Sequence, residues 1–119
     1  MSYHEKQRKV NGNKYVFEAK KYMQQNYYRS LTICEVADML HIGDRYLYNL
    51  FIKHEGISPK KFLNKLRRNQ ACELLKSPHI SVTEVAKSVG FDDVLTFSRF
   101  FKKNTNLSPT EYRKTVFDE

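Results

Sequence analysis

The sequence predicts an all-α protein in which one small helical unit occurs twice, with a long helix between the two copies. Only 4 Gly and 3 Pro occur in 119 residues, so few positions interrupt a helix. Hydrophobic residues make up 40% of the chain and recur at helical spacing, which is enough apolar surface for a folded core. Caps, apolar positions and turns also repeat along the chain after 49 or 50 residues.

The first helix is expected from Lys14 to Tyr27. Residues 1–12 are polar and run into the turn-like cluster "NGN", so we expect them to form a flexible N-terminal tail. After this cluster, apolar side chains loosely follow one helical face: Tyr15, Phe17, Ala19, Tyr22 and Met23.

Two short helices with a break between them follow. Thr32 and Glu35 match the S/T-x-x-E capping box of a helix start. The apolar stripe behind this cap consists of Ile33, Val36, Ala37 and Leu40. The segment "HIG" interrupts the stripe, and a second helix is expected from Asp44 to His54, with inward-facing Leu47, Leu50 and Phe51. This arrangement is typical of a helix-turn-helix.

A long central helix is expected next. Ser58 is a good N-cap and Pro59 suits the first helical position, while "SPH" ends the helix after Lys76. The ~19 residues would make a rod of roughly 28 Å. The predicted organisation is a tail (1–12), a first helix-turn-helix subdomain (13–57), the central linker helix (58–77), a second subdomain (78–115) and a C-terminal tail (116–119).

The second subdomain repeats the first in register. Ser81 and Glu84 repeat the capping box at an offset of 49, and "EVA" occurs at 35–37 and again at 84–86. After one inserted residue the offset becomes 50, and the matched positions are Phe97, Phe100, Phe101, Ser108, Pro109 and Tyr112. Because caps, apolar positions and helix starts all recur together, we interpret the chain as an internal duplication.

The charge balance indicates an anionic partner. Lys and Arg number 21 and Asp and Glu 13, which gives a net charge of 21 − 13 = +8. Cys34 and Cys72 lie inside helical apolar patterns without partners at ligand spacing, so we expect packed thiols and neither a metal nor a cofactor. No segment has the length of a membrane span or the pattern of a signal peptide, and we expect a cytoplasmic protein.

Double-stranded DNA is the partner that a repeated helix-turn-helix favours. The second helix of each unit would leave its N-terminal outer face free for a major groove. Arginine can pair with guanine, asparagine with adenine, and apolar groups with the methyl group of thymine. The base-contact candidates are Arg45, Tyr48, Asn49, Leu95, Thr96, Ser98 and Arg99, and the phosphate-contact candidates are Lys53, Lys102 and Lys103. For each of them a merely solvated position is the alternative, and core packing or a cap contact would explain Val94 and Leu95 equally well.

The two halves together resemble the DNA-binding domain of the AraC/XylS family over about Val16 to Lys114. The more specific half contains "EVAKSVGF", "FSRFFKK" and "LSPTEYR". The resemblance implies seven helices in two homeodomain-like helix-turn-helix subdomains, and two recognition helices in successive major grooves. It also implies transcriptional control, with activation expected, of a bacterial operon. Since successive grooves are ~34 Å apart, a central helix of roughly 28 Å suggests helix tilt, modest DNA bending or full engagement of only one subdomain on weak sites.

Three positions depart from the repeat or from the family pattern. Asn106 occupies a turn that Gly56 fills in the first copy, and asparagine tolerates the left-handed conformation. His41 stands where the second copy has Gly90, and we interpret it as a tolerated turn residue. Arg68 lies where the central helix of the family is generally apolar, so we expect its stem to pack and its head to reach solvent or phosphate.

Other functions stay open at this point. A basic helical module that docks on RNA polymerase or a signalling partner is the alternative, and it predicts little salt-linked binding to duplex DNA. An enzyme is disfavoured, because no phosphate loop, nucleophile–base pair or metal spacing occurs. No segment could serve as an effector-binding or dimerisation domain, so a fragment of a longer regulator is favoured over a stand-alone activator. Similarity in "KYMQQNYYRSLTICEVADML" suggests control of carbohydrate use.

Overall fold

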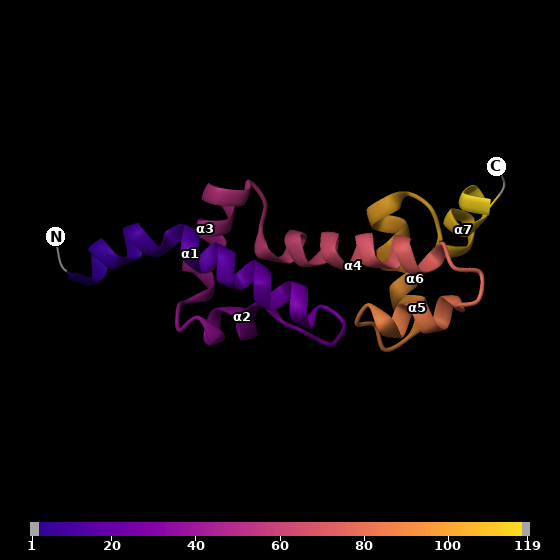
Figure 1. The fold of residues 1–119 in the computed structure, drawn as a ribbon, viewed down its shortest axis with the longest axis horizontal. Coiled ribbons are helices and arrows are strands. Elements are labelled where there is room, and N and C mark those ends of the chain that lie inside the picture. Colours follow the sequence, from indigo (N-terminus) through magenta and orange to yellow (C-terminus); the bar gives the residue numbers. More distant parts are fainter. Residues whose placement is uncertain (1–2, 118–119) are drawn as a thin grey trace. The chain divides into compact units, whose positions relative to one another are not determined.

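The computed structural model describes residues 3–117, and these residues form seven α-helices and no strand (Figure 1). The all-α prediction is therefore confirmed. The helices are α1 (Tyr3–Asn26), α2 (Ile33–Met39), α3 (Asp44–Glu55), α4 (Pro59–Leu75), α5 (Val82–Ser88), α6 (Val94–Thr105) and α7 (Pro109–Phe117).

The chain divides into two compact units. The first contains Leu31–Leu63 together with the chain up to Asn26, and the second contains Tyr27–Ser30 together with the chain from Asn64 onward. The boundary therefore lies inside α4, whereas the sequence predicted a linker helix separate from both subdomains. The reason is that α4 gives Leu63 to the buried residues of the first unit, and Ala71 and Leu75 to the core of the second.

The first unit packs α1 against α2 and α3. A salt bridge of 3.0 Å joins Lys20 on α1 to Glu55 on α3, and the Tyr22 hydroxyl donates a hydrogen bond to the Glu35 carboxylate. The buried apolar side chains of this unit are Val16, Ala19, Met23, Leu31, Val36, Ala37, Leu47, Leu50, Phe51 and Leu63. On α2 and α3 they recur at the helical spacing that the sequence showed, so one face of each short helix is committed to packing. On α1 the predicted face needs correction, because Val16 is buried and Phe17, which was expected on that face, is 63% exposed.

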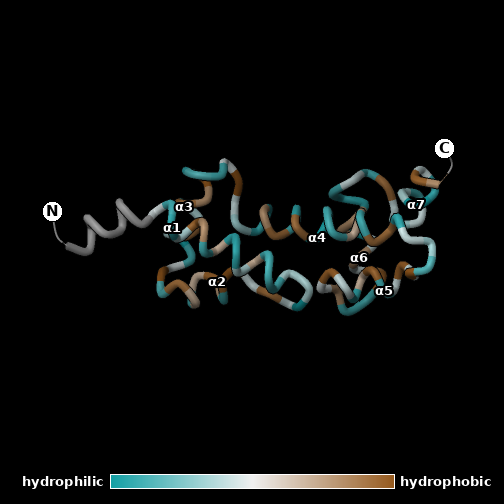
Figure 2. The backbone as a smooth tube through the Cα atoms, viewed as in Figure 1, coloured by the Kyte–Doolittle hydropathy of each residue, from teal (hydrophilic) through white to brown (hydrophobic). Residues whose placement is uncertain are grey.

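The second unit packs α5 against α6 and α6 against α7. Its core consists of Ala71, Leu75, Val85, Ala86, Val89, Phe97 and Phe101. Two of these side chains are aromatic, and the Phe97 and Phe101 ring centroids lie 5.8 Å apart in a tilted arrangement. In Figure 2 apolar and polar stretches alternate along α4, as expected for a helix with one buried face.

The N-terminus differs from the prediction. Helix α1 begins at Tyr3, so the tail expected over residues 1–12 is helical from residue 3, and "NGN" does not form a turn. Gly12 is instead buried inside α1, where a Cβ would lie 3.3 Å from both the Leu50 and His54 side chains of α3. The missing side chain permits a close helix approach, which is a different use of glycine from the turn we inferred. Residues 1–2 of that tail lie outside the described residues.

The C-terminal tail predicted at 116–119 also needs correction. Val116 and Phe117 belong to α7, and residues 118–119 lie outside the described part of the chain. Helix α7 starts with a reciprocal capping box. The Glu111 amide donates to the Ser108 hydroxyl over 3.1 Å, and the Ser108 amide donates to the Glu111 carboxylate over 2.9 Å.

The internal duplication appears in the helices themselves. Helices α2 and α5 both have 7 residues, and α3 and α6 both have 12. Both predicted caps form, because the Glu35 amide donates to Thr32 and the Glu84 amide donates to Ser81, each over 3.1 Å. Each unit therefore presents a short capped helix, a turn and a longer second helix.

Candidate nucleic-acid interface

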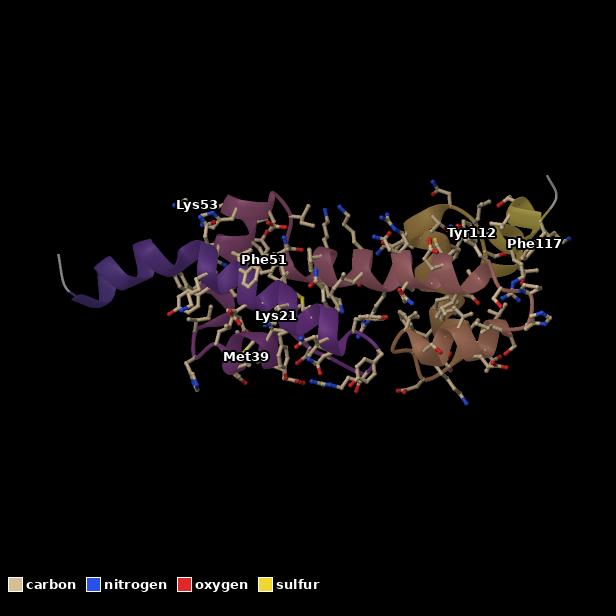
Figure 3. All side chains as sticks on the ribbon, in the orientation of Figure 1. Lys21, Met39, Phe51, Lys53, Tyr112 and Phe117 are labelled. Atoms are coloured by element: carbon tan, nitrogen blue, oxygen red, sulfur yellow. The ribbon has the colours of Figure 1, made fainter. Side chains whose placement is uncertain are left out.

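Helix α3 is seated by three buried residues, Leu47, Leu50 and Phe51. Its opposite face is exposed and carries the predicted Arg45, Tyr48, Asn49 and Lys53. Figure 3 shows the side chains of Phe51 and Lys53, which are buried and exposed respectively. The structure thus brings the four first-copy candidates together on one helix surface.

Helix α6 is seated by Phe97 and Phe101, the positions that match Leu47 and Phe51. The predicted Leu95, Thr96, Arg99, Lys102 and Lys103 are all exposed, whereas Ser98 is only half exposed. Val94 is exposed as well, with 39% of its surface accessible, so core packing does not account for it. The second-copy candidates therefore share the outer side of α6.

The two helices begin differently. Gly43 precedes α3 and supplies no side-chain cap, whereas Asp93 caps α6. One Asp93 oxygen accepts from the Thr96 amide and the other accepts from the Thr96 hydroxyl, both over 2.8 Å. These hydrogen bonds, the amide first, hold the pKa of Asp93 below its usual range. Thr96 thus uses its only side-chain donor within the protein.

Turns with positive φ hold each second helix in place. His41 (φ 58°) and Gly90 (φ 97°) lie between the two helices of each unit, and Gly56 (φ 75°) and Asn106 (φ 69°) end α3 and α6. Asn106 therefore adopts the left-handed conformation that the sequence suggested, and His41, interpreted only as a tolerated turn residue, is left-handed as well. The alignment of the two copies placed a glycine or a tolerant residue at each of these positions.

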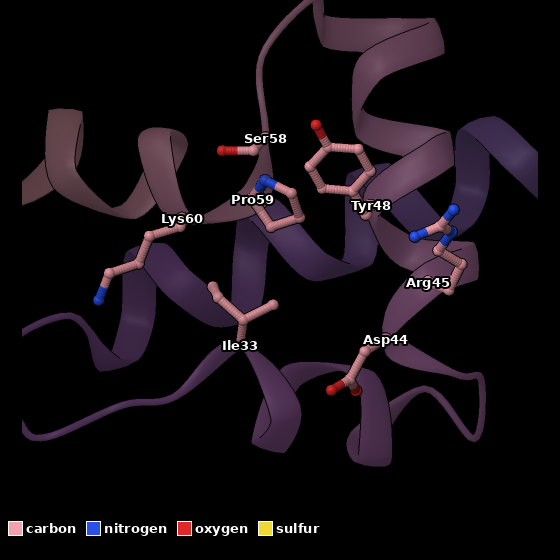
Figure 4. A pocket seen from close by; sticks show the side chains of 7 residues that line it. All are labelled: Ile33, Asp44, Arg45, Tyr48, Ser58, Pro59 and Lys60. Atoms are coloured by element: carbon pink, nitrogen blue, oxygen red, sulfur yellow. The ribbon is translucent and has the colours of Figure 1, made fainter.

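An open hollow of about 500 Å³ lies beside the start of α3 (Figure 4). The first residues of α3 and α4 line it together with Ile33, and Tyr48 lines it from the second turn of α3. The complete lining is Ile33, Asp44, Arg45, Tyr48, Ser58, Pro59 and Lys60. Two of the four candidates on α3, Arg45 and Tyr48, therefore also line a concave surface, which no pattern in the sequence predicted.

Arg67 is a structural residue that sequence reasoning missed. Only 6% of it is exposed, and its guanidinium donates to the Tyr27 carbonyl over 3.1 Å and to the Arg29 carbonyl over 2.8 Å. It also lies 5.6 Å from the ring centre of Phe91, and burial lowers its pKa. Arg68, which the sequence singled out instead, is half-buried and bonds the neighbouring Asn69 side chain over 3.1 and 3.2 Å.

Arg113 holds the backbone in a similar way. It donates over 3.0 Å to the carbonyl of Leu75 and over 3.1 Å to that of Ser77, and it also bonds the Ile80 carbonyl. These three carbonyls belong to the end of α4 and the segment that leads to α5. Both arginines are therefore committed to the protein backbone, which takes them out of the set of cations available to a ligand.

Within the part of the chain that the structure describes, no helix is long and apolar enough to cross a membrane. Among the side chains that the structure describes, no group of three or more His, Cys, Asp or Glu is arranged to hold a metal ion.

Two short helices joined by a turn, with the second helix seated by its inner face and exposed on its outer face, define a helix-turn-helix protein. A family model described as "Helix-turn-helix domain" matches residues 36–115. The chain belongs to the AraC-type helix-turn-helix family of DNA-binding transcriptional regulators. The resemblance noted in the sequence is therefore confirmed.

Individual relatives agree with this family. The raffinose operon transcriptional regulatory protein RafR of Pediococcus pentosaceus is 40% identical over 80% of this chain and 34% of its own length. The lactose operon transcription activator of Staphylococcus xylosus is 34% identical over 85% of this chain and 36% of its own length. The chain thus spans about a third of the length of these relatives. The solved C-terminal domain of AraT, a response regulator from Geobacillus stearothermophilus, is 37% identical, with a TM-score of 0.82 over 85% of this chain and 84% of that one.

Proposed function

We propose that the chain binds double-stranded DNA sequence-specifically through the exposed faces of α3 and α6, with the two helices in successive major grooves. The observation that carries this proposal is the matched design of the two helices. Both have 12 residues, both bury the matched pair of positions (Leu47 and Phe51 in α3, Phe97 and Phe101 in α6), and both expose a face that bears arginine and lysine. A helix of this kind fits the major groove, where side chains can reach base edges.

On each helix, the chemistry of the side chains decides which residues we propose to contact bases and which to contact phosphates. Arg45, Tyr48 and Asn49 on α3, and Leu95, Thr96, Ser98 and Arg99 on α6, would contact bases. Lys53, Lys102 and Lys103 lie in later turns of the helices, where single cations suit phosphate oxygens. The net charge of +8 would add long-range attraction to the duplex.

The regulatory role in this proposal is activation of a bacterial operon for carbohydrate use. Support comes from the relatives, one of which is a regulator of a raffinose operon and another an activator of a lactose operon. Activation would require a contact with RNA polymerase in addition to DNA, and that contact is part of the proposal.

Salt dependence tests the binding proposal. Affinity for duplex DNA is expected to fall steeply between two salt concentrations, because each neutralised phosphate releases a counterion. Six to ten phosphate contacts would reduce affinity by roughly 10³–10⁵ between 50 and 200 mM salt. Fluorescence anisotropy with a labelled random duplex measures this slope. Weak binding with a flat slope would instead favour the protein-docking alternative.

Arg99→Ala tests whether α6 makes base contacts. If Arg99 pairs with a base, its loss should relax the preference at one position of one half-site by about 1–3 kcal/mol. Selection of binding sites from random duplexes, before and after the change, measures that preference. Lys103→Ala, one turn along the same helix, is the control and should weaken all sequences equally. An equal loss on every sequence for Arg99→Ala would reassign Arg99 to a phosphate.

A further inference from the structure

The first turn of α6 exposes apolar side chains. Leu95 has 58% of its surface accessible and Val94 has 39%, although both lie on the helix proposed to contact DNA. Single exposed apolar residues are common, so their exposure alone carries no function. The repeat makes this pair informative, because the position of Leu95 holds Arg45 in α3, a residue with five donors.

The same turn offers no side-chain hydrogen-bond donor to a ligand. Val94 and Leu95 have none, and the Thr96 hydroxyl donates to the Asp93 carboxylate over 2.8 Å. The next side chains that contain a donor are Ser98 and Arg99, later in the helix. A protein surface without donors cannot bond the acceptor atoms N7 and O6 of guanine or O4 of thymine. The C5 methyl group of thymine is the one major-groove feature that apolar side chains recognise.

The charges at the N-terminal end of α6 also favour a contact with bases over a contact with a phosphate group. The hydrogen bonds from Thr96 lower the pKa of Asp93, so its carboxylate is negatively charged. One of the carboxylate oxygens accepts the hydrogen bond of the Thr96 amide. A negative charge repels phosphate, and an amide already bonded cannot bind one. The cations of the helix, Arg99, Lys102 and Lys103, all come later in the sequence.

We propose that Leu95, with Val94 beside it, recognises thymine methyl groups, so that the half-site bound by α6 contains thymine opposite the first turn of this helix. The half-site bound by α3 is recognised there by hydrogen bonds from Arg45. This inference rests on the proposed DNA binding and adds to it the base that one turn of one helix selects.

Substitution of thymine by deoxyuracil tests the inference, because it removes the methyl group and leaves every hydrogen-bonding atom in place. The duplex is the best sequence from the selection experiment, with each thymine replaced in turn. Wild-type protein should lose about three- to tenfold in affinity at one or two thymines of the α6 half-site, as expected for burial of one methyl group or slightly more. Anisotropy at fixed salt measures each loss.

Leu95→Ala completes the test as a cycle. This variant should bind thymine and deoxyuracil duplexes with equal affinity at those positions, because the side chain that contacts the methyl group is gone. Arg45→Ala is the matched control from the other copy, and it should keep the full thymine-to-uracil ratio in the α6 half-site even though its affinity is lower. Leu95 is exposed, so Leu95→Ala should fold, and circular dichroism checks this.

The outcomes separate this inference from the proposed function. Salt-dependent, sequence-selective binding without any methyl effect in the α6 half-site would overturn the inference and leave the proposed function standing. A methyl effect that persists in Leu95→Ala would overturn the role of Leu95. If the wild-type chain shows no salt-dependent binding to duplex DNA at all, the proposed function fails and the inference falls with it.

Discussion

Replacement of Gly90 by alanine is expected to destabilise the second unit severely. A Cβ at this position would lie 2.6 Å from the Tyr27 carbonyl oxygen, 3.0 Å from the Arg29 carbonyl oxygen and 3.2 Å from the Arg67 guanidinium. Two of these neighbours are backbone atoms, which cannot rotate away as a flexible side chain would. Crowding of this kind costs about 1–3 kcal/mol, and positive φ adds about 1–2 kcal/mol for alanine. We therefore expect a loss of about 2–5 kcal/mol in the free energy of unfolding.

Gly56→Ala is the control that isolates backbone conformation. Gly56 also has positive φ, at 75°, but a Cβ there would meet nothing within 4 Å. Its replacement should cost only the conformational part, about 1–2 kcal/mol. Urea unfolding followed by circular dichroism gives the free energies, and amide hydrogen exchange in α5 and α6 locates the effect of Gly90→Ala. Equal losses for the two variants would show that φ alone, without crowding, explains the glycine at position 90.

The repeat explains why the sequence could predict this turn but not its crowding. His41 occupies the matched position in the first unit with φ 58°, so a side chain is compatible with the turn itself. What differs is the neighbourhood, because the Tyr27 and Arg29 carbonyls come from a segment about 60 residues earlier in the chain. The repeated caps and apolar positions predict the local conformation of the turn. They do not show which distant backbone segment packs against it.

The helices and the outer faces of α3 and α6 could be predicted because their signals are local. The caps at Thr32 and Ser81 and the buried positions Leu47 and Phe97 depend on residues three to five apart, which a sequence displays directly. Gly12 was misread because a glycine in a turn and a glycine at a close helix contact look alike without the partner helix. Which exposed residues touch DNA stays a prediction, since exposure is shared by functional and merely solvated positions.

Arg67 is the residue whose role depends most on distant backbone contacts that the sequence does not display. Arg67→Met is expected to cost about 2–4 kcal/mol of unfolding free energy. Methionine fills much of the same space but donates no hydrogen bond. The Tyr27 and Arg29 carbonyls would then lose the donors that reach them over 3.1 and 2.8 Å. The contact with the Phe91 ring would be lost as well. Arg67→Lys should recover part of the loss, because an ammonium can reach one carbonyl but lacks the planar fork that serves two.

Arg68→Met provides a control on the adjacent residue of the same helix. Arg68 donates its hydrogen bonds to the Asn69 side chain and not to backbone carbonyls of another segment, so its replacement should change stability by no more than about 0.5 kcal/mol. Chemical denaturation of the three variants gives the ranking Arg67→Met, Arg67→Lys, Arg68→Met, from the largest loss to the smallest. The reverse ranking of the two methionine variants would restore the sequence-based emphasis on Arg68. The double variant Arg67→Met/Gly90→Ala should lose less unfolding free energy than the sum of the two single losses, because both changes disturb the Tyr27 and Arg29 carbonyls.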